Sequence, residues 1–213
     1  ISDDQSAGQD INRSEIVINN GSLIAIGTES DSIWFTSNSA DPNLADWYGF
    51  RVASQVGVID LQYVSASYMS YGFRFDNYTY FYGSQDDYLN VSHSHFRDIT
   101  SHMFSNKPYF TTCSWTLANN IFSRFSMFSN GTVYAQTGAV VTIDNNVLED
   151  MGNYFIDYIN LAGSDNDGSP SRISITNNNI SGYNTGVQNI TSTDQTEDGY
   201  AIIIKDNIVT PSY

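Results

Sequence analysis

Basic residues are scarce in this chain of 213 residues, where 8 Lys and Arg stand against 23 Asp and Glu. The formal net charge is therefore −15. Binding to nucleic acid or to anionic lipids depends on Lys and Arg side chains that neutralise phosphate charge. The charge balance thus argues against both partners. It favours a well-solvated acidic surface in contact with salt.

Cysteine is almost absent, and long apolar runs are missing. Cys113 is the single cysteine, which excludes an internal disulfide. A buried free thiol and an intermolecular disulfide at Cys113 both stay open, since free cysteines are commonly buried. No apolar run approaches the ~20 residues that a membrane-spanning helix needs, so we expect no membrane span.

The first residue is Ile1 rather than Met, as in a secreted protein that has lost its signal peptide or in a fragment. Asn-x-Ser/Thr motifs, which permit N-glycosylation outside the cytoplasm, are frequent. We therefore expect an extracellular or cell-surface glycoprotein. The candidate acceptors are Asn12, Asn20, Asn77, Asn90, Asn130, Asn179 and Asn189.

A helical period is missing too, whereas one phrase recurs along the C-terminal two thirds of the chain. Each copy is an alternating apolar strand that runs into one or two Asn residues and then Ile or Val. The copies are WTLANNIF (115–122), VTIDNNVL (141–148), ISITNNNI (173–180) and IIIKDNIV (202–209), with LQYVSASYM (61–69) and LNVSHSHF (89–96) as variants. Taking Ser67, His95, Asn120, Asn146, Asn179 and Asn207 as equivalent gives intervals of 28, 25, 26, 33 and 28 residues. A strand unit of this size cannot bury its apolar face alone, so the repeat predicts a β-solenoid.

The predicted fold is all-β, a parallel β-helix of about seven coils of roughly 25–30 residues. Residues 1–14 form a polar lead-in, and residues 15–213 form one domain. Equivalent residues of successive coils stack at the ~4.8 Å spacing of neighbouring strands. A turn Asn tolerates left-handed backbone and hydrogen-bonds main chain. We expect a stacked amide ladder made of Asn120, Asn146, Asn179 and Asn207.

Three motifs near the N-terminus carry a resemblance to a known class of proteins. They are Gly21-Ser22-Leu23-Ile24-Ala25-Ile26-Gly27-Thr28, Ile33-Trp34-Phe35-Thr36-Ser37 and Asp46-Trp47-Tyr48-Gly49-Phe50. The chain resembles right-handed parallel β-helix (pectin-lyase-like) cell-surface repeat proteins, with an archaeal sheath or S-layer component as the specific expectation. The resemblance implies a right-handed β-helix. It says little about activity, because this fold hosts lyases, hydrolases, adhesins and inert scaffolds alike.

A carbohydrate-active site is the alternative function. The adjacent Asp86 and Asp87 are similar to the paired acids of β-helical glycosidases, which act as general acid and as base toward water. His93 and Arg97 would line the same groove. The Gly-His-Gly and Arg-Ile-Lys signatures of polygalacturonases and the Arg-x-Pro-x-x-Arg context of pectate lyases are missing. We therefore expect a protein that is not an enzyme, with a polysaccharide lyase or hydrolase as the runner-up.

Metal-binding patterns are weak. The run Asp165-Asn166-Asp167-Gly168 starts like a calcium loop but lacks the third ligand pair and the closing Glu. An acidic turn is the favoured interpretation, with calcium at Asp165 and Asp167 as the alternative and no other cofactor expected. His93 and His95 have the spacing of two ligands on one strand face, but a structural histidine is favoured there.

Exposed aromatic residues and uncapped solenoid ends favour contacts with other proteins. Tyr78, Tyr80 and Tyr82 would form an apolar patch if they point outward. Neither terminus contains an amphipathic helix that would cover an open strand edge, and Ile203 lies in the last strand. The leading prediction is an extracellular structural protein that assembles with itself into a sheath, surface layer or fibre. Other envelope proteins or glycans are further candidate partners, and a glycan-binding adhesin is a third hypothesis.

Overall fold

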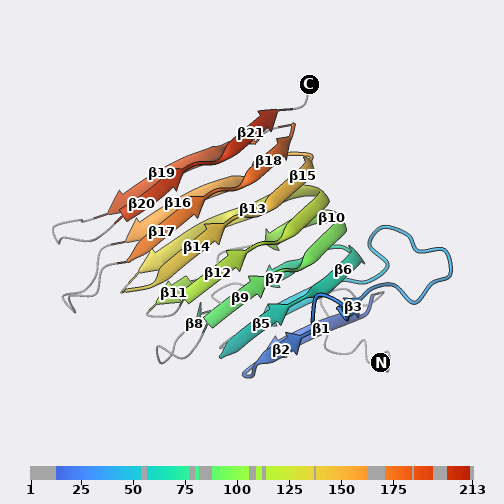
Figure 1. The fold of residues 1–213 in the computed structure, drawn as a ribbon. Coiled ribbons are helices and arrows are strands. Elements are labelled where there is room, and N and C mark those ends of the chain that lie inside the picture. The colour runs from blue at the N-terminus through green and yellow to red at the C-terminus, as the bar shows by residue number, and fades with distance from the viewer. Residues whose placement is uncertain are drawn as a thin grey trace.

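A computed structural model of the chain describes residues 13–53, 57–76, 80–81, 88–105, 109–111, 114–136, 138–162, 171–183, 185–193 and 201–211. Within these ranges all regular secondary structure is β-strand, and the named strands pair in parallel. The strands wind into a β-solenoid, which confirms the predicted fold class (Figure 1). The part of the chain that is described contains no helix suited to crossing a membrane.

The first face of the solenoid is a seven-stranded parallel sheet. Its strands, in order, are β2 (Leu23–Ile26), β5 (Val58–Gln62), β9 (Tyr88–Ser92), β12 (Ser114–Ala118), β14 (Val140–Asp144), β17 (Arg172–Thr176) and β20 (Ala201–Lys205). Neighbours in this order are one coil apart in the sequence. The face therefore gives the register of the whole stack.

The remaining strands belong to a larger sheet that bends to form two more faces. The second face contains β3 (Ile33–Phe35), β6 (Val64–Met69), the start of β10 (His95–Ser105), the start of β13 (Ile121–Gln136), β15 (Val147–Met151), β18 (Asn179–Gly182) and β21 (Ile208–Pro211). The third face contains β1 (Glu15–Asn19), β4 (Gly49–Ala53), β7 (Phe73–Phe75), the later parts of β10 and β13, β16 (Ile156–Ala162) and β19 (Val187–Thr193). The short strands β8 (Tyr80–Phe81) and β11 (Tyr109–Thr111) pair beside the end of β13.

The described chain completes about five full turns, fewer than the seven coils predicted. Rungs at the two ends are less regular than those between them. Residues 36–48 leave the stack as a loop between β3 and β4, and the last rung contributes β20 and β21 (Figure 1). Counting repeated phrases therefore overestimates the complete turns.

The corner between the first and second faces explains the paired Asn residues. The first residue of each corner has left-handed backbone, with φ between 52° and 59° in Tyr63, His93, Asn119, Asn145, Asn177 and Asp206. Asn adopts this conformation at lower cost than most residues. The next residue points inward and forms the ladder. Its members are Ser94, Asn120, Asn146, Asn178 and Asn207.

The hydrogen bonds of the ladder repeat from coil to coil. The backbone N–H of Asn120 donates to Oδ1 of Asn146 (3.0 Å), and Asn120 Nδ2 donates to the same oxygen (3.0 Å) and to the carbonyl of Val91 (2.7 Å). Asn146 makes the same three bonds to Asn178 and Leu117. Each buried amide thus satisfies main-chain groups that the sharp corner leaves without sheet partners.

Three of the six positions taken as equivalent in the sequence, Ser67, His95 and Asn179, do not belong to the ladder. In the triplet 177–179, Asn178 is the ladder residue, while Asn179 is exposed and starts β18 opposite Val147. His95 is likewise one position past the ladder, where Ser94 stands, and it pairs with Ser65 rather than with Ser67. The ladder therefore does contain Asn120, Asn146 and Asn207, but its fourth predicted member is displaced by one residue.

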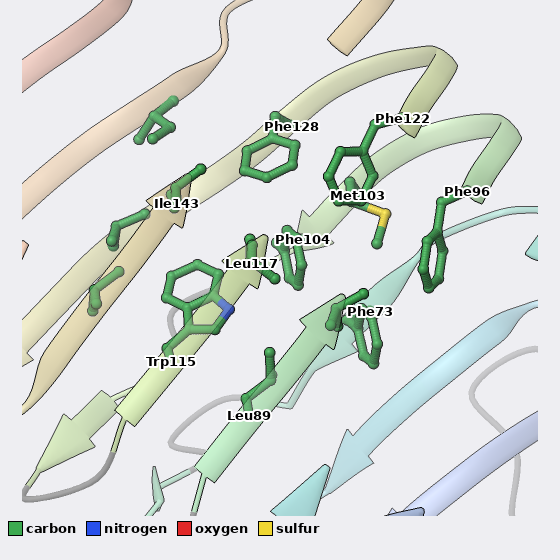
Figure 2. Close-up of a cluster of buried hydrophobic side chains, with 14 of the residues drawn as sticks. Phe73, Leu89, Phe96, Met103, Phe104, Trp115, Leu117, Phe122, Phe128 and Ile143 are labelled. Atoms are coloured by element: carbon green, nitrogen blue, oxygen red, sulfur yellow. The ribbon is translucent and has the colours of Figure 1, made fainter. Parts of the chain in front are cut away.

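The core of the described residues is a cluster of buried side chains that extends from Ile18 to Ile180. First-face strands contribute aliphatic columns, and the bent strands contribute stacked rings. Phe104 is fully buried, and its ring centroid lies 5.4 Å from that of Phe73, 5.3 Å from Trp115 and 5.3 Å from Phe128 (Figure 2). Such aromatic pairs contribute beyond the area that they bury.

The Asp-Trp-Tyr-Gly-Phe motif has a local structural cause. Gly49 has φ +111°, and a Cβ there would lie 1.9 Å from the carbonyl oxygen of Tyr71, so only glycine fits. Trp47 is buried and its Nε1 donates to the carbonyl of Ser67 (2.8 Å). Asp46 accepts from Ser37 Oγ (2.6 Å), which holds the pKa of Asp46 below its usual value. The motif fastens the loop of residues 36–48 to the stack.

Candidate assembly surfaces

Each end of the solenoid presents one edge strand for each face. At one end these strands are β1, β2 and β3, and at the other they are β19, β20 and β21 (Figure 1). In the described chain each of the six pairs with a neighbouring strand on one side only. A strand edge of this kind is a template for pairing with another strand.

Apolar side chains at both ends are unusually exposed. At the N-terminal end the exposed fractions are 63% for Ile24, 55% for Ile26 and 62% for Trp34. At the C-terminal end, Ile203 is 39% exposed, Ile204 44%, Ile208 64% and Val209 50%. Clusters of exposed apolar residues of this kind mark interaction surfaces.

Asn207 is the last member of the amide ladder among the described residues. Asn207 Nδ2 donates to the carbonyl of Ile175 (2.9 Å), as the ladder pattern requires. The same Nδ2 also donates to the carbonyl of Lys205 in its own rung (3.0 Å). At the N-terminal end the column continues into Val64 and Ile33, which carry no amide. The ladder therefore fastens the middle and C-terminal rungs, and the end surfaces are mainly apolar.

The middle of the second face is charged. Asp98 and Arg124 stand on neighbouring rungs, and Arg124 donates from Nε to Asp98 Oδ1 (2.6 Å) and from Nη2 to Oδ2 (2.9 Å). Both residues have left-handed backbone, as do Tyr68 and Asp150 in the same column, where the long strands bend toward the third face. The hydrogen bonds from Arg124 hold the pKa of Asp98 below its ordinary value.

This ion pair predicts an acid-sensitive element of stability. Because the folded-state pKa of Asp98 is depressed, its contribution is present above the unfolded pKa of about 3.9 and is lost as pH falls through the lower folded value. Asp98→Asn keeps a residue that tolerates left-handed backbone but removes the charge. As pH falls below about 4, the free energy of unfolding should therefore decrease less in the variant than in the native chain. Urea midpoints measured across pH 2–7 test this. Equal pH profiles would contradict this assignment, and Asp31→Asn, at an exposed site, is the control.

The residues of the predicted carbohydrate site are only partly described. Asp86 and Asp87 lie outside the described residues. His93 occupies a corner with φ 52°, is exposed, and stacks on Tyr63 with ring centroids 5.0 Å apart. Arg97 lies on the outward side of β10, with Nε 4.0 Å from Asp98 Oδ2. No contact brings His93 and Arg97 together among the described residues, so the enzyme hypothesis stays a prediction.

The histidines have structural surroundings. His95 is half-buried and its Nε2 lies 3.3 Å from Ser123 Oγ, while His102 Nδ1 lies 2.7 Å from Ser101 Oγ. Burial lowers the pKa of both, and Arg97 and Arg124 near His95 and Arg74 near His102 lower it further. The described ranges contain no group of three or more His, Cys, Asp or Glu that could hold a metal ion.

Several predicted sites fall outside the described residues: Asp165 and Asp167 of the calcium candidate, Tyr78 and Tyr82 of the aromatic patch, Cys113, and the sequons at Asn12 and Asn77. Tyr80 belongs to β8, where it pairs with Tyr109. Among the described sequons, Asn20, Asn179 and Asn189 are exposed, whereas Asn90 donates from its amide to Asp60 (2.8 Å). Asn130 lies half-buried in β13.

A cavity of about 730 Å³ lies beside β1 and β3 at the N-terminal end. The exposed indole of Trp34 and the side chain of Trp47 contribute to its wall, together with Thr36, Ser37 and Asn38. Sequence reasoning missed Trp34, Ile24 and Ile208 as surface residues. The signal for finding them is a comparison of outward positions from coil to coil, in which an apolar residue on each terminal rung stands next to a polar residue one rung deeper.

Comparison with known proteins gives no match: no family model, no curated protein and no solved structure is similar to this chain. The assignment of function therefore depends on the geometry of the solenoid and its two ends.

Proposed function

We propose that this chain is an extracellular structural protein that assembles with itself through the ends of its solenoid, as a subunit of a cell-surface sheath, surface layer or fibre. The observation that carries the proposal is the coincidence, at both ends, of edge strands on each face with exposed apolar side chains. Edges of this kind pair with other strands unless a helix, a charge or a proline blocks them. The single proline in these six strands is Pro211, at the end of β21.

The rest of the surface supports a passive role. Polar residues predominate at the outward positions of the middle rungs of the first face, with Ala118 and Val140 among the exceptions. The described residues contain no metal-ligand cluster. The exposed sequon residues Asn20, Asn179 and Asn189 suit a glycosylated extracellular protein. The specific class, a pectin-lyase-like surface protein such as an archaeal sheath or S-layer component, belongs to this proposal and is supported by the resemblance of the N-terminal motifs alone.

The proposal predicts salt-dependent association of the purified chain. A net charge of −15 makes copies repel at low salt, and screening shortens this repulsion from about 30 Å at 0.01 M to about 3 Å at 1 M. Sedimentation velocity should give 23.7 kDa particles in dilute low-salt buffer and much larger particles at high salt. Sedimentation as a monomer at every salt concentration would contradict self-assembly.

Glycan binding is a second candidate function, favoured by the cavity at Trp34. An exposed indole stacks on the apolar face of a sugar ring, and the nearby hydroxyl and amide groups suit its hydroxyls. A glycan array of the native chain tests this directly. Binding that Trp34→Ala abolishes and Tyr183→Ala preserves would support the candidate, and an array without hits would remove it; Tyr183 is 66% exposed and lies far along the chain.

A further inference from the structure

One column of outward side chains on the first face is polar in its middle and apolar at its two ends. Reading from rung to rung, this column consists of Ile24, Asp60, Asn90, Thr116, Thr142, Ser174 and Ile203. The five inner members are polar and the two outer ones are isoleucine, 63% and 39% exposed. Solvation alone would favour polar residues at the ends as well.

The outward column of the second face has apolar ends as well. Its members are Trp34, Ser65, His95, Ile121, Val147, Asn179 and Ile208. Trp34 at one end is 62% exposed and Ile208 at the other is 64% exposed. The residues beside these ends, Ser65 and Asn179, are polar, whereas Ile121 and Val147 in the middle of the column are apolar. Both columns therefore place an outward apolar residue on each terminal rung.

The inward positions of the two ends have compatible sizes. Continuing the register beyond β20 would place Ile202 on Leu23 and Ile204 on Ala25. Ile204 is 44% exposed, and Ala25 is the smallest inward residue of β2. If the register continued past β21 into another copy, Val209 would lie over Phe35 of that copy. Past β19, Val187 would likewise lie over Ile16. Each of these four core columns thus finds an apolar partner.

We infer that two copies of this chain stack head to tail in register, with β19, β20 and β21 of one copy pairing with β1, β2 and β3 of the next. The inference rests on the proposed self-assembly and specifies its geometry. Because all the sheets are parallel, translating a copy along the axis continues them without reversing any strand. Ile203 then lies beside Ile24 and Ile208 beside Trp34. This contact joins different surfaces of the two copies, so it repeats without closing and produces a fibre.

Charge at the corner is compatible with this arrangement. Lys205 continues the column of Ile26, next to the acidic turn that contains Glu29 and Asp31. In the isolated chain Lys205 Nζ lies 3.7 Å from Asp206 Oδ2. In the stacked pair Lys205 would stand between Asp206 of its own copy and the acidic turn of the next, where a cation reduces the repulsion between the two.

Disulfide trapping tests the register. In a Cys113→Ser background, Ile24→Cys and Ile203→Cys are placed on separate chains and mixed at high salt under mild oxidation. Neighbouring strands are about 4.8 Å apart, within the Cα separation that a disulfide accepts, so covalent dimers of the mixed chains are expected. Each variant alone should give almost none, because head-to-tail stacking keeps identical positions apart. The pair Trp34→Cys and Ile208→Cys repeats the test on the second face if the first pair misfolds.

The control and the contradicting outcomes are separable. Ser174→Cys lies one rung deeper than Ile203 in the same column, roughly 9.6 Å from Ile24 of the next copy, and should not be trapped. Dimers of Ile203→Cys with itself, or equal trapping of Ser174→Cys, would overturn the head-to-tail register. If sedimentation shows large particles but Ile24→Cys and Ile203→Cys form no disulfide with each other, the register is overturned while self-assembly stays intact. Chains that remain monomers would refute both.

Discussion

Phe104→Ala is expected to lower the free energy of unfolding by about 3–5 kcal/mol, the range for removing a buried aromatic ring. Phe104 is fully buried and touches rings from three other strands, so its removal leaves a cavity in the centre of the core (Figure 2). Urea denaturation of the dilute, low-salt monomer measures the effect without a contribution from assembly.

Tyr183→Ala is the matched control for Phe104→Ala. Tyr183 is 66% exposed, so the loss of its ring should change the free energy of unfolding by no more than about 0.5 kcal/mol. If the two variants had similar midpoints, Phe104 would not lie in a packed core, and the inward alternation of the third face would be incorrect.

Asn178→Leu is expected to destabilise the chain by roughly 3 kcal/mol, because it leaves buried polar groups without partners. Asn178 is 1% exposed, and its Oδ1 accepts from the backbone N–H of Asn146 (2.9 Å). Its Nδ2 donates to the carbonyl of Ile143 (2.9 Å). Leucine has a similar size but can replace neither bond, so the effect reports the ladder rather than a change of volume.

The neighbouring Asn179→Leu provides the control for the ladder. Asn179 is exposed on β18, and the substitution should cost less than about 0.5 kcal/mol in the same urea titration. A larger loss at Asn179 than at Asn178 would place the ladder where the sequence comparison first put it and would contradict the register of this corner.

Much of the fold follows from the sequence because stacking makes each coil repeat the last. The alternating phrases at 115–122, 141–148, 173–180 and 202–209 predicted strands, and β12, β14, β17 and β20 lie at their starts with a shift of one residue. The doubled Asn at 119–120 and 145–146 predicted the corner and the ladder. The triplet at 177–179 misled the alignment by one residue, since nothing in three identical letters indicates which one points inward.

The candidate assembly surfaces were harder to predict, for physical reasons. A terminal rung has the same alternating pattern of apolar residues as an inner rung. The sequence of that rung alone does not indicate that a neighbouring rung is absent on one side. The outward isoleucines Ile24 and Ile203 become informative only when the register aligns them with polar residues in the rungs between. His93 and His95 were expected to share one face of a strand, whereas the chain turns at His93.

Under the proposed function, the two ends of the solenoid are the surfaces through which the chain acts. Its middle rungs are held by apolar columns, stacked rings and a buried amide ladder, and their outer surface is mainly polar. The terminal rungs combine open strand edges with apolar side chains that find partners when the register continues. Such an arrangement suits a protein whose function is to join copies of itself.

Electron cryomicroscopy of the chain at high salt tests this account most directly. Seven first-face strands at about 4.8 Å each predict fibres with an axial repeat of about 34 Å for one subunit. A strong spacing of about 4.8 Å along the axis should accompany it, because the strands lie across the fibre. Dispersed single particles, or fibres whose repeating unit holds two chains joined end to end in opposite directions, would contradict the account.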